Sequence, residues 1–141
     1  MMANSDPEAR RRIDGLLWEA DQVRSVAQRH LRAYAAAVAV GDLVLTARLP
    51  GHRPGAIPLS RIWRVLCRVA PEYAEWGLFF DSLTGRHREV LDGAQPSSRE
   101  ADDLLRDATS FRDRVVARLH HPAYRGRQLS EQRRRLASLG W

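Results

Sequence analysis

The sequence predicts an all-α protein, a four-helix bundle followed by a short C-terminal tail that is either helical or disordered. Apolar residues recur at intervals of three and four over four long segments, which is the period of an amphipathic helix. We find no segment with the alternation of apolar and polar residues that marks a half-buried β-strand. The length of 141 residues suits a single domain, which we expect to contain a bundle over residues 1–119 and a basic tail over residues 120–141.

The first two helical patterns follow each other closely. The first helix is expected to begin at Pro7, with Ser5 or Asp6 as its cap, because proline suits the first helical position. A second pattern covers residues 31–45. One helix over both patterns would be roughly 60 Å long, which is too long for a compact domain of this size. We therefore expect a kink or a turn within residues 24–29.

A third helical segment follows a loop over residues 50–58 that is rich in proline and glycine. Ser60 is its expected cap. Its apolar positions alternate in steps of four and three, as in a heptad seam, and are Ile62, Leu66, Val69, Tyr73, Trp76, Phe80 and Leu83. The seam keeps its phase through Pro71, which removes one backbone hydrogen bond. We therefore expect one kinked helix or two nearly collinear helices, interrupted at Gly85.

A fourth helix is predicted to start at a capping box formed by Ser97 and Glu100. Its apolar face consists of Ala101, Leu104, Leu105, Ala108, Phe111, Val115 and Leu119. The sequence His-His-Pro over residues 120–122 ends it. A shorter helical pattern follows in the tail, over residues 131–138.

The net charge of +6 is concentrated at the C-terminal end of the chain. All 23 basic residues are arginines. Residues 1–111 contain 15 arginines and 15 acidic residues, so they are neutral, and residues 112–141 carry the whole excess. A neutral body with a basic tail is suited to contact with phosphates or with an acidic protein surface.

The cysteine content and the hydropathy bear on the compartment. A single cysteine, Cys67, cannot form an internal disulfide, so we expect a reducing, cytoplasmic location. The longest nearly apolar run, residues 33–47, contains Asp42 and is too short to span a bilayer. We therefore expect no membrane partner.

Two blocks of the sequence resemble a small actinobacterial HEPN family. They are residues 62–80, IWRVLCRVAPEYAEWGLFF, and residues 98–108, SREADDLLRDA, within a resemblance that covers about residues 13–119. The chain departs from the family pattern at Gly41 and Asp42, which bears on the straightness of the second helix. The resemblance implies a HEPN-like helical bundle that often dimerises. It also implies an accessory role in DNA repair, since genes of this family tend to lie near those of translesion DNA polymerases.

Many HEPN domains are metal-independent ribonucleases with an Arg-x4-6-His motif at a dimer cleft, so the resemblance makes catalysis one alternative. In such an enzyme, Arg114 would hold phosphate and His120 would assist attack by the ribose 2′-hydroxyl. Arg114 with His121 and Arg24 with His30 also fit the spacing. Five histidines, three permitted spacings and 23 arginines in 141 residues give about 2.4 such pairs by chance. Three observed pairs therefore leave the question of catalysis open.

Our first hypothesis is a non-catalytic module that binds nucleic acid or a DNA-repair protein, such as a polymerase, through its basic tail. The candidate phosphate contacts in addition to Arg114 are Arg112, Arg118, Arg125, Arg127, Arg133, Arg134 and Arg135. Binding through several phosphates would weaken steeply with added salt. A purely structural helical adaptor is the remaining alternative.

Aromatic residues supply the candidate protein interfaces. Trp63 and Phe79 lie beside the apolar seam and are the expected contacts of a homodimer. Leu136 and Trp141 could anchor the tail in a groove of a partner.

The acidic residues do not predict a metal site. Acids in a first helical turn favour the positive end of the helix dipole, and Asp102 with Arg106 fits an i,i+4 ion pair. No cysteine or histidine group has metal-ligand spacing, and Cys67 on the seam is expected to be a small buried hydrophobe. We therefore expect neither a metal nor a cofactor.

Overall fold

The computed structural model describes residues 2–119, and within them the chain is all-α. The elements in order are α1 (Met2–Gln22), α2 (Val26–Arg48), α3 (Leu59–Val69), the 3₁₀ helix η1 (Pro71–Tyr73), α4 (Ala74–Ser82), α5 (Thr84–Leu91) and α6 (Ser98–Leu119). The predicted fold class is thus confirmed, while the helical pattern over residues 131–138 lies outside the described residues. No described helix is long and apolar enough to cross a membrane.

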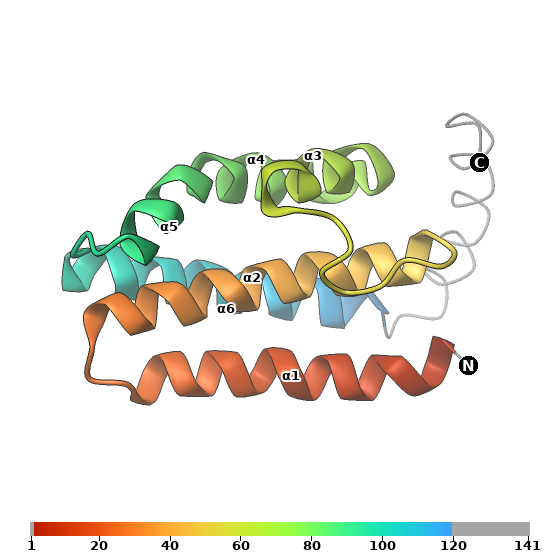
Figure 1. The fold of residues 1–141 in the computed structure, drawn as a ribbon. Coiled ribbons are helices and arrows are strands. Elements are labelled where there is room, and N and C mark those ends of the chain that lie inside the picture. Colours follow the sequence, from red (N-terminus) through yellow and green to blue (C-terminus); the bar gives the residue numbers. More distant parts are fainter. Residues whose placement is uncertain (1, 120–141) are drawn as a thin grey trace.

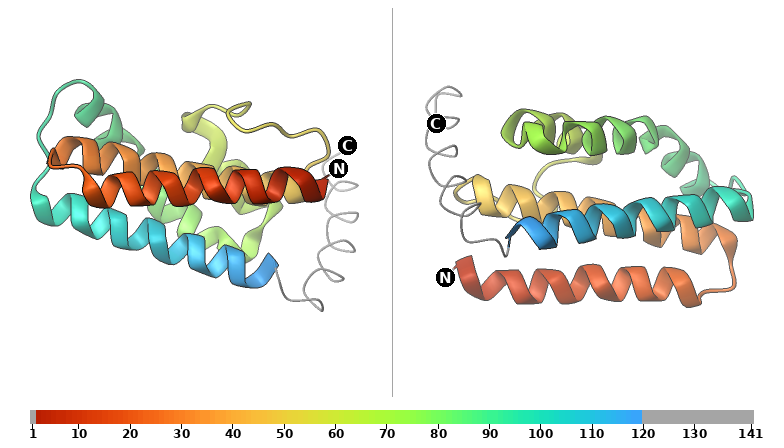
Figure 2. Two further views of the ribbon diagram at one scale, coloured as in Figure 1. Left: turned by 90° about the horizontal axis from the view of Figure 1, so that it is seen from below. Right: turned by 180° about the vertical axis from the view of Figure 1, so that it is seen from behind.

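The helices form three layers, with α2 in the middle of the molecule (Figure 1). Helix α2 packs along α1 on one side and along α6 beside it, and it also contacts α3 and α5. This central position explains why α2 is rich in buried alanine and valine and lacks a broad polar face. The start of α1 and the end of α6 lie at the same end of the bundle (Figure 2).

The turn expected between the first two helices is present, and it falls at residues 23–25. Ser25 caps α2, since its side-chain oxygen accepts a hydrogen bond of 3.2 Å from the backbone N–H of Gln28. The expected start of the first helix is wrong, because α1 begins at Met2 and Pro7 lies inside it. Ser5 and Asp6 therefore do not cap it. The fixed φ of proline is helical, so it marks a position near a helix start without specifying which one.

Helix α2 continues unbroken through Gly41 and Asp42. A Cβ on Gly41 would lie 3.3 Å from Cζ3 of Trp63, so this glycine leaves room for the indole ring of α3. The departure from the family pattern at this position is accommodated by packing and does not interrupt the helix.

Helices α3 and α4 fold back on each other as an antiparallel hairpin, so the prediction of collinear helices is wrong. Trp63 and Gly77 would be about 21 Å apart along one continuous helix. Instead, a Cβ on Gly77 would lie 3.3 Å from the carbonyl oxygen of Trp63 and 2.7 Å from Sγ of Cys67. The chain reverses at Ala70, whose φ of −135° and ψ of 70° are not helical, and Pro71 opens the 3₁₀ turn that follows.

Two further predicted boundaries are wrong. Helix α3 begins at Leu59, so Ser60 lies inside it and does not cap it. Gly85 lies inside α5, and the interruption falls at Leu83, between α4 and α5. Directly after the break, the Thr84 hydroxyl lies 2.7 Å from the Tyr34 hydroxyl and connects the start of α5 to α2. Gly93 follows α5 with a φ of +108°, which favours glycine.

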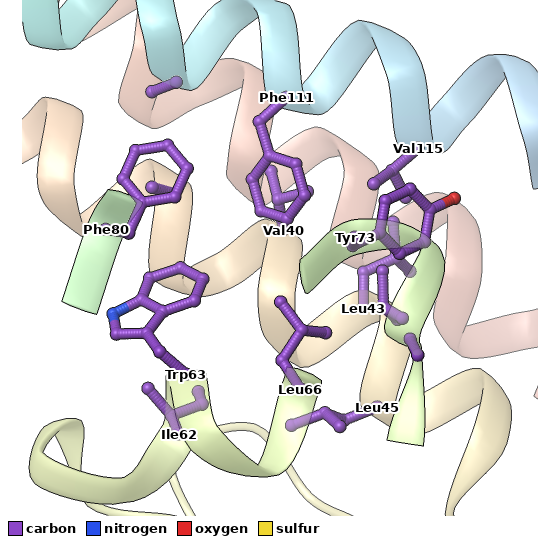
Figure 3. Packing of buried hydrophobic residues seen from close by; sticks show 14 of the residues in the cluster. Val40, Leu43, Leu45, Ile62, Trp63, Leu66, Tyr73, Phe80, Phe111 and Val115 are labelled. Carbon is purple, nitrogen blue, oxygen red and sulfur yellow. The ribbon is translucent and has the colours of Figure 1, made fainter. Parts of the chain in front are cut away.

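The apolar seam of the third segment forms the core between the layers (Figure 3). Its members Ile62, Leu66, Val69, Tyr73 and Phe80 are all buried, which confirms the predicted burial. Trp63 is also fully buried, so the prediction that it contacts a partner is wrong. The hairpin turns that side of α3 towards α4, where the Trp63 ring stacks on Phe80 with centroids 5.0 Å apart.

The predicted capping box of α6 is confirmed. The backbone N–H of Glu100 donates to the Ser97 side chain at 3.0 Å, and the Ser97 N–H donates to the Glu100 carboxylate at 3.3 Å. The predicted pairing of Asp102 with Arg106 is wrong. Asp102 accepts a hydrogen bond of 2.5 Å from Arg29 of α2, because the first turns of α2 and α6 lie side by side.

Replacement of Gly77 should separate the hairpin. We expect Gly77→Ala to lower the free energy of unfolding by about 1–3 kcal/mol, because the added methyl group overlaps Cys67 and the Trp63 backbone. Urea unfolding measures the change. Cys67→Ala in the same chain should restore part of the loss by removing the overlapping sulfur.

Gly85→Ala provides a matched control, since Gly85 also lies in a short helix and a Cβ there would meet nothing within 4 Å. We expect it to stabilise the protein by roughly 0.5–1 kcal/mol. Equal effects of the two substitutions would contradict the close packing of α3 on α4.

Candidate nucleic-acid interface

Most arginines of the described fold fall into two groups. The first group is paired with carboxylates within the fold and consists of Arg29, Arg32, Arg48, Arg86, Arg99, Arg106 and Arg112. The second group is exposed and has no ion-pair partner among the described residues. Its members are Arg11, Arg12, Arg24, Arg53, Arg61, Arg64, Arg88 and Arg114. A polyanion can bind the second group without breaking the fold.

Arg112 belongs to the first group, and its role as a phosphate contact stays a prediction. Its Nε and Nη2 donate to both carboxylate oxygens of Asp14, at 2.9 and 3.1 Å. The hydrogen bond to Asp14 raises the pKa of Arg112 above its ordinary value. The pair connects α6 to α1, and its two residues are 98 positions apart in the sequence. Residue spacing along the chain cannot predict a contact at that separation.

The last two turns of α6 present Arg114 and Arg118. Arg114 is exposed. Arg118 is partly buried, with its guanidinium carbon 5.5 Å from the centroid of the Tyr73 ring, a cation–π arrangement that fixes its position. The remaining predicted site residues lie outside the described residues. They are His120, Arg125, Arg127, Arg133, Arg134, Arg135, Leu136 and Trp141.

Phe79 stays a candidate for an interface. Its side chain is 39% exposed, and the neighbouring Leu78 is 66% exposed. Both lie on α4, whose opposite side holds Trp76 and Phe80 against Phe111 of α6. The exposed apolar side chains of Leu78 and Phe79 therefore lie on the outer side of α4, next to the exposed Glu75 and Ser82.

All three histidines of the described part of the chain have their side chains inside the protein. His52 contacts Asp42 at 2.8 Å, and both side chains are buried. His30 is 1% exposed, whereas Arg24 lies exposed in the turn before α2. The Arg24–His30 spacing match therefore does not place the two groups at a shared surface, and it is a coincidence of sequence.

His30 and His87 belong to a buried polar cluster of α2 and α5. The Trp63 indole donates to the Tyr34 hydroxyl at 3.0 Å, which lies 2.7 Å from the Thr84 hydroxyl. The His87 ring stacks on Tyr34 with centroids 4.2 Å apart. Nδ1 of each histidine has no hydrogen-bond partner among the described residues. Burial lowers the pKa of both histidines, so they are neutral near pH 7.

An ion pair covers this cluster towards α6. Arg86 donates to both oxygens of Glu100, at 2.7 and 3.2 Å, and holds the pKa of that carboxyl below its ordinary value. Glu100 in turn lies 3.8 Å from Nε2 of His30. The Glu100 carboxylate accepts hydrogen bonds from both the Ser97 N–H and Arg86, so its role here is structural.

The other chemically active groups have structural partners. Arg106 lies between Asp103 and Asp107, at 3.0 and 3.9 Å, and occupies the carboxylates that could have faced a cation. Within residues 2–119, no group of three or more potential ligands could hold a metal ion. The Cys67 thiol donates to the carbonyl oxygen of Ala74 at 3.6 Å, and burial raises its pKa, so it stays protonated.

A family model described as a HEPN-like domain matches residues 20–116, which is more than half of the chain. The protein therefore belongs to the HEPN-like family, and this agrees with the resemblance of residues 62–80 and 98–108. Comparisons with curated proteins and with solved structures gave no match.

Acid should destabilise the protein before its carboxylates titrate. The unfolded chain binds protons at His30 and His87 as the pH falls below about 6.5, while the folded state holds both rings neutral. The two rings therefore leave the free energy of unfolding unchanged above that pH. Below it, each ring lowers the free energy of unfolding by at most about 1.4 kcal/mol per pH unit.

Urea unfolding at about pH 7.5 and about pH 5.5 measures this loss. His87→Phe keeps a ring against Tyr34 and removes one titrating group, so its stability should depend less on pH than that of the wild type. An unchanged pH dependence in both His87→Phe and His30→Leu would contradict the assignment.

Proposed function

We propose that the protein is a non-catalytic HEPN-type module that binds nucleic acid. Its first contact surface consists of the last turns of α6 and the arginine-rich segment that follows them. The observation that carries this proposal is the position of Arg114, exposed at the end of α6 without a described ion-pair partner. The chain then continues into residues 120–141, which contain five more arginines and one acidic residue.

The charge distribution supports a polyanion as the ligand. Internal ion pairs neutralise many arginines of the folded body, and the surplus lies at the end of α6 and beyond. Arginine binds phosphate through a planar group with several donors, which suits a phosphodiester backbone. The resemblance to a family associated with translesion polymerase genes makes DNA the first nucleic acid to test, and a repair polymerase the first protein partner.

The buried histidines favour binding over cleavage. Ribonuclease chemistry of the Arg-x4-6-His type requires an imidazole that reaches the substrate, and the three described histidines are inside the fold. A catalytic pair would depend on Arg114 with His120 or His121. That arrangement defines the second candidate function, a metal-independent ribonuclease, and the exposure of Arg114 is the observation that favours it.

Binding to a labelled DNA oligonucleotide should be tight at low salt and weaken as salt is added. Changing Arg133, Arg134 and Arg135 to glutamine in the full-length protein should lower affinity by about tenfold or more. The slope of log affinity against log salt should fall by about 2–3, because up to three phosphate contacts are lost. Fluorescence anisotropy over a salt series measures both.

The matched control changes Arg24, Arg88 and Arg99 to glutamine, which removes the same charge from the folded body. It should change the affinity by less than about threefold and leave the slope nearly intact. Equal losses in the two triple variants would show that only net charge matters, and absence of binding at low salt would refute the proposal.

RNA should remain intact in the presence of the protein and a chelator. We expect no cleavage above buffer for the wild type, because binding does not supply an acid–base group. Denaturing gels of several RNA substrates give the readout. Cleavage by the wild type that is lost in both Arg114→Ala and His120→Ala would establish the ribonuclease instead.

A further inference from the structure

Helix α3 has two sharply different faces. Ile62, Leu66 and Val69 are buried against the rest of the bundle. On the opposite side, the arginines at positions 61, 64 and 68 are all exposed. Their spacing of three and four residues places them in one row along the helix.

Two arginines of the row, Arg61 and Arg64, form no ion pair within the described residues. Glu72, which follows α3 in the sequence, is engaged by both terminal nitrogens of the buried Arg48. Arg68 has a further contact within the fold, so the uncompensated charge of the row rests on Arg61 and Arg64.

The turn that follows α3 contacts the end of α6. Arg118 of α6 covers the ring of Tyr73, which lies four residues after Val69, the last residue of α3. Arg48 also donates to the Val69 carbonyl oxygen, at 3.5 Å. The turn after α3 and the end of α6 therefore lie at the same end of the bundle, and α3 runs from there along the outer layer (Figure 1).

We infer that the outer face of α3 is a second phosphate-binding surface, which receives a nucleic-acid strand as it leaves the end of α6. The inference rests on the proposed function and adds to it a surface within the folded domain. From Arg61 to Arg64 the helix rises by about 4.5 Å. That length is close to the spacing of roughly 3.4 Å per nucleotide along one strand, so the two guanidinium groups can reach neighbouring phosphates.

The helix offers the arginines from a rigid position. Trp63 fixes α3 between Gly41 and Gly77, and its indole N–H is bonded to Tyr34. A fixed helix holds its guanidinium groups at constant spacing relative to successive phosphates. Binding therefore costs less conformational entropy than it would for a mobile segment. An acidic protein surface would also be attracted to the row, but it would not reproduce the dependence on phosphate number that a nucleic acid shows.

The test compares two charge-reversed variants of the full-length protein. Arg61→Glu with Arg64→Glu alters the row, and Arg24→Glu with Arg88→Glu is the matched control, with exposed arginines on other elements and the same net charge. Affinities for labelled single-stranded DNA, for a duplex of the same sequence and for the corresponding RNA are measured over a salt series. The α3 variant should lose about tenfold or more in affinity and between one and two units of salt slope.

The control should lose less than about threefold. Arg61→Lys with Arg64→Lys, which keeps the charge, should stay within about threefold of the wild type. Circular dichroism and thermal unfolding verify that all variants are folded. Equal losses in the α3 variant and the control, or an equal loss in the lysine variant, would overturn the inference.

Failure of the inference and failure of the proposed function give different results. Loss of binding in the Arg133, Arg134 and Arg135 variant, with the α3 variant equal to its control, refutes the inference and leaves the proposed function standing. A wild-type protein that binds none of the three nucleic acids at low salt refutes both. An acidic protein that binds through Arg61 and Arg64 while nucleic acid does not would also overturn the inference.

Discussion

The position of Trp63 between two glycines determines how the layers of this protein fit together. A side chain on Gly41 would meet the indole ring, and a side chain on Gly77 would meet the Trp63 carbonyl oxygen. The ring stacks on Phe80 of α4, and its N–H donates to Tyr34 of α2. Tyr34 in turn lies 2.7 Å from the Thr84 hydroxyl, which brings α5 into the same contact network. One buried indole thus connects α2, α3, α4 and α5.

This packing also determines what the surface and the interior can do. With Trp63 turned inwards, the opposite face of α3 presents its arginines to solvent, while the polar cluster around Tyr34 keeps His30 and His87 inside. The interior therefore holds neutral imidazoles without access to a substrate, and the exterior holds cations. That division supports a binding role, in which the fold supplies charge and position, more than it supports acid–base chemistry.

Periodicity predicted the buried faces well because burial depends on local spacing. The heptad seam identified Ile62, Leu66 and Phe80 as core, and the capping box at Ser97 marked the start of α6. The same seam could not reveal the reversal at Ala70. Four residues separate α3 from α4, which is close to one helical turn. The heptad spacing of apolar residues is therefore the same whether the second helix continues the first or folds back on it. The misassignment of Trp63 followed directly from this ambiguity.

The candidate site was less predictable, because charge compensation depends on residues far apart in the sequence. The sequence indicates Arg112 as a phosphate contact, and only the fold shows that it also pairs with Asp14. The row on α3 was missed because the overall charge of residues 1–111 is balanced. Its spacing of three and four residues was the signal that could have identified it. Contacts between side chains that are distant in the sequence then distinguish paired arginines from unpaired ones, and the sequence alone does not.

Arginine-specific chemical modification, read by mass spectrometry with and without bound oligonucleotide, tests the central claim most directly. It reports which guanidinium groups the nucleic acid covers. We expect protection of Arg61, Arg64 and Arg114, and unchanged reactivity of Arg24 and Arg88. Equal protection of all five, or protection of none of the first three, would contradict the claim.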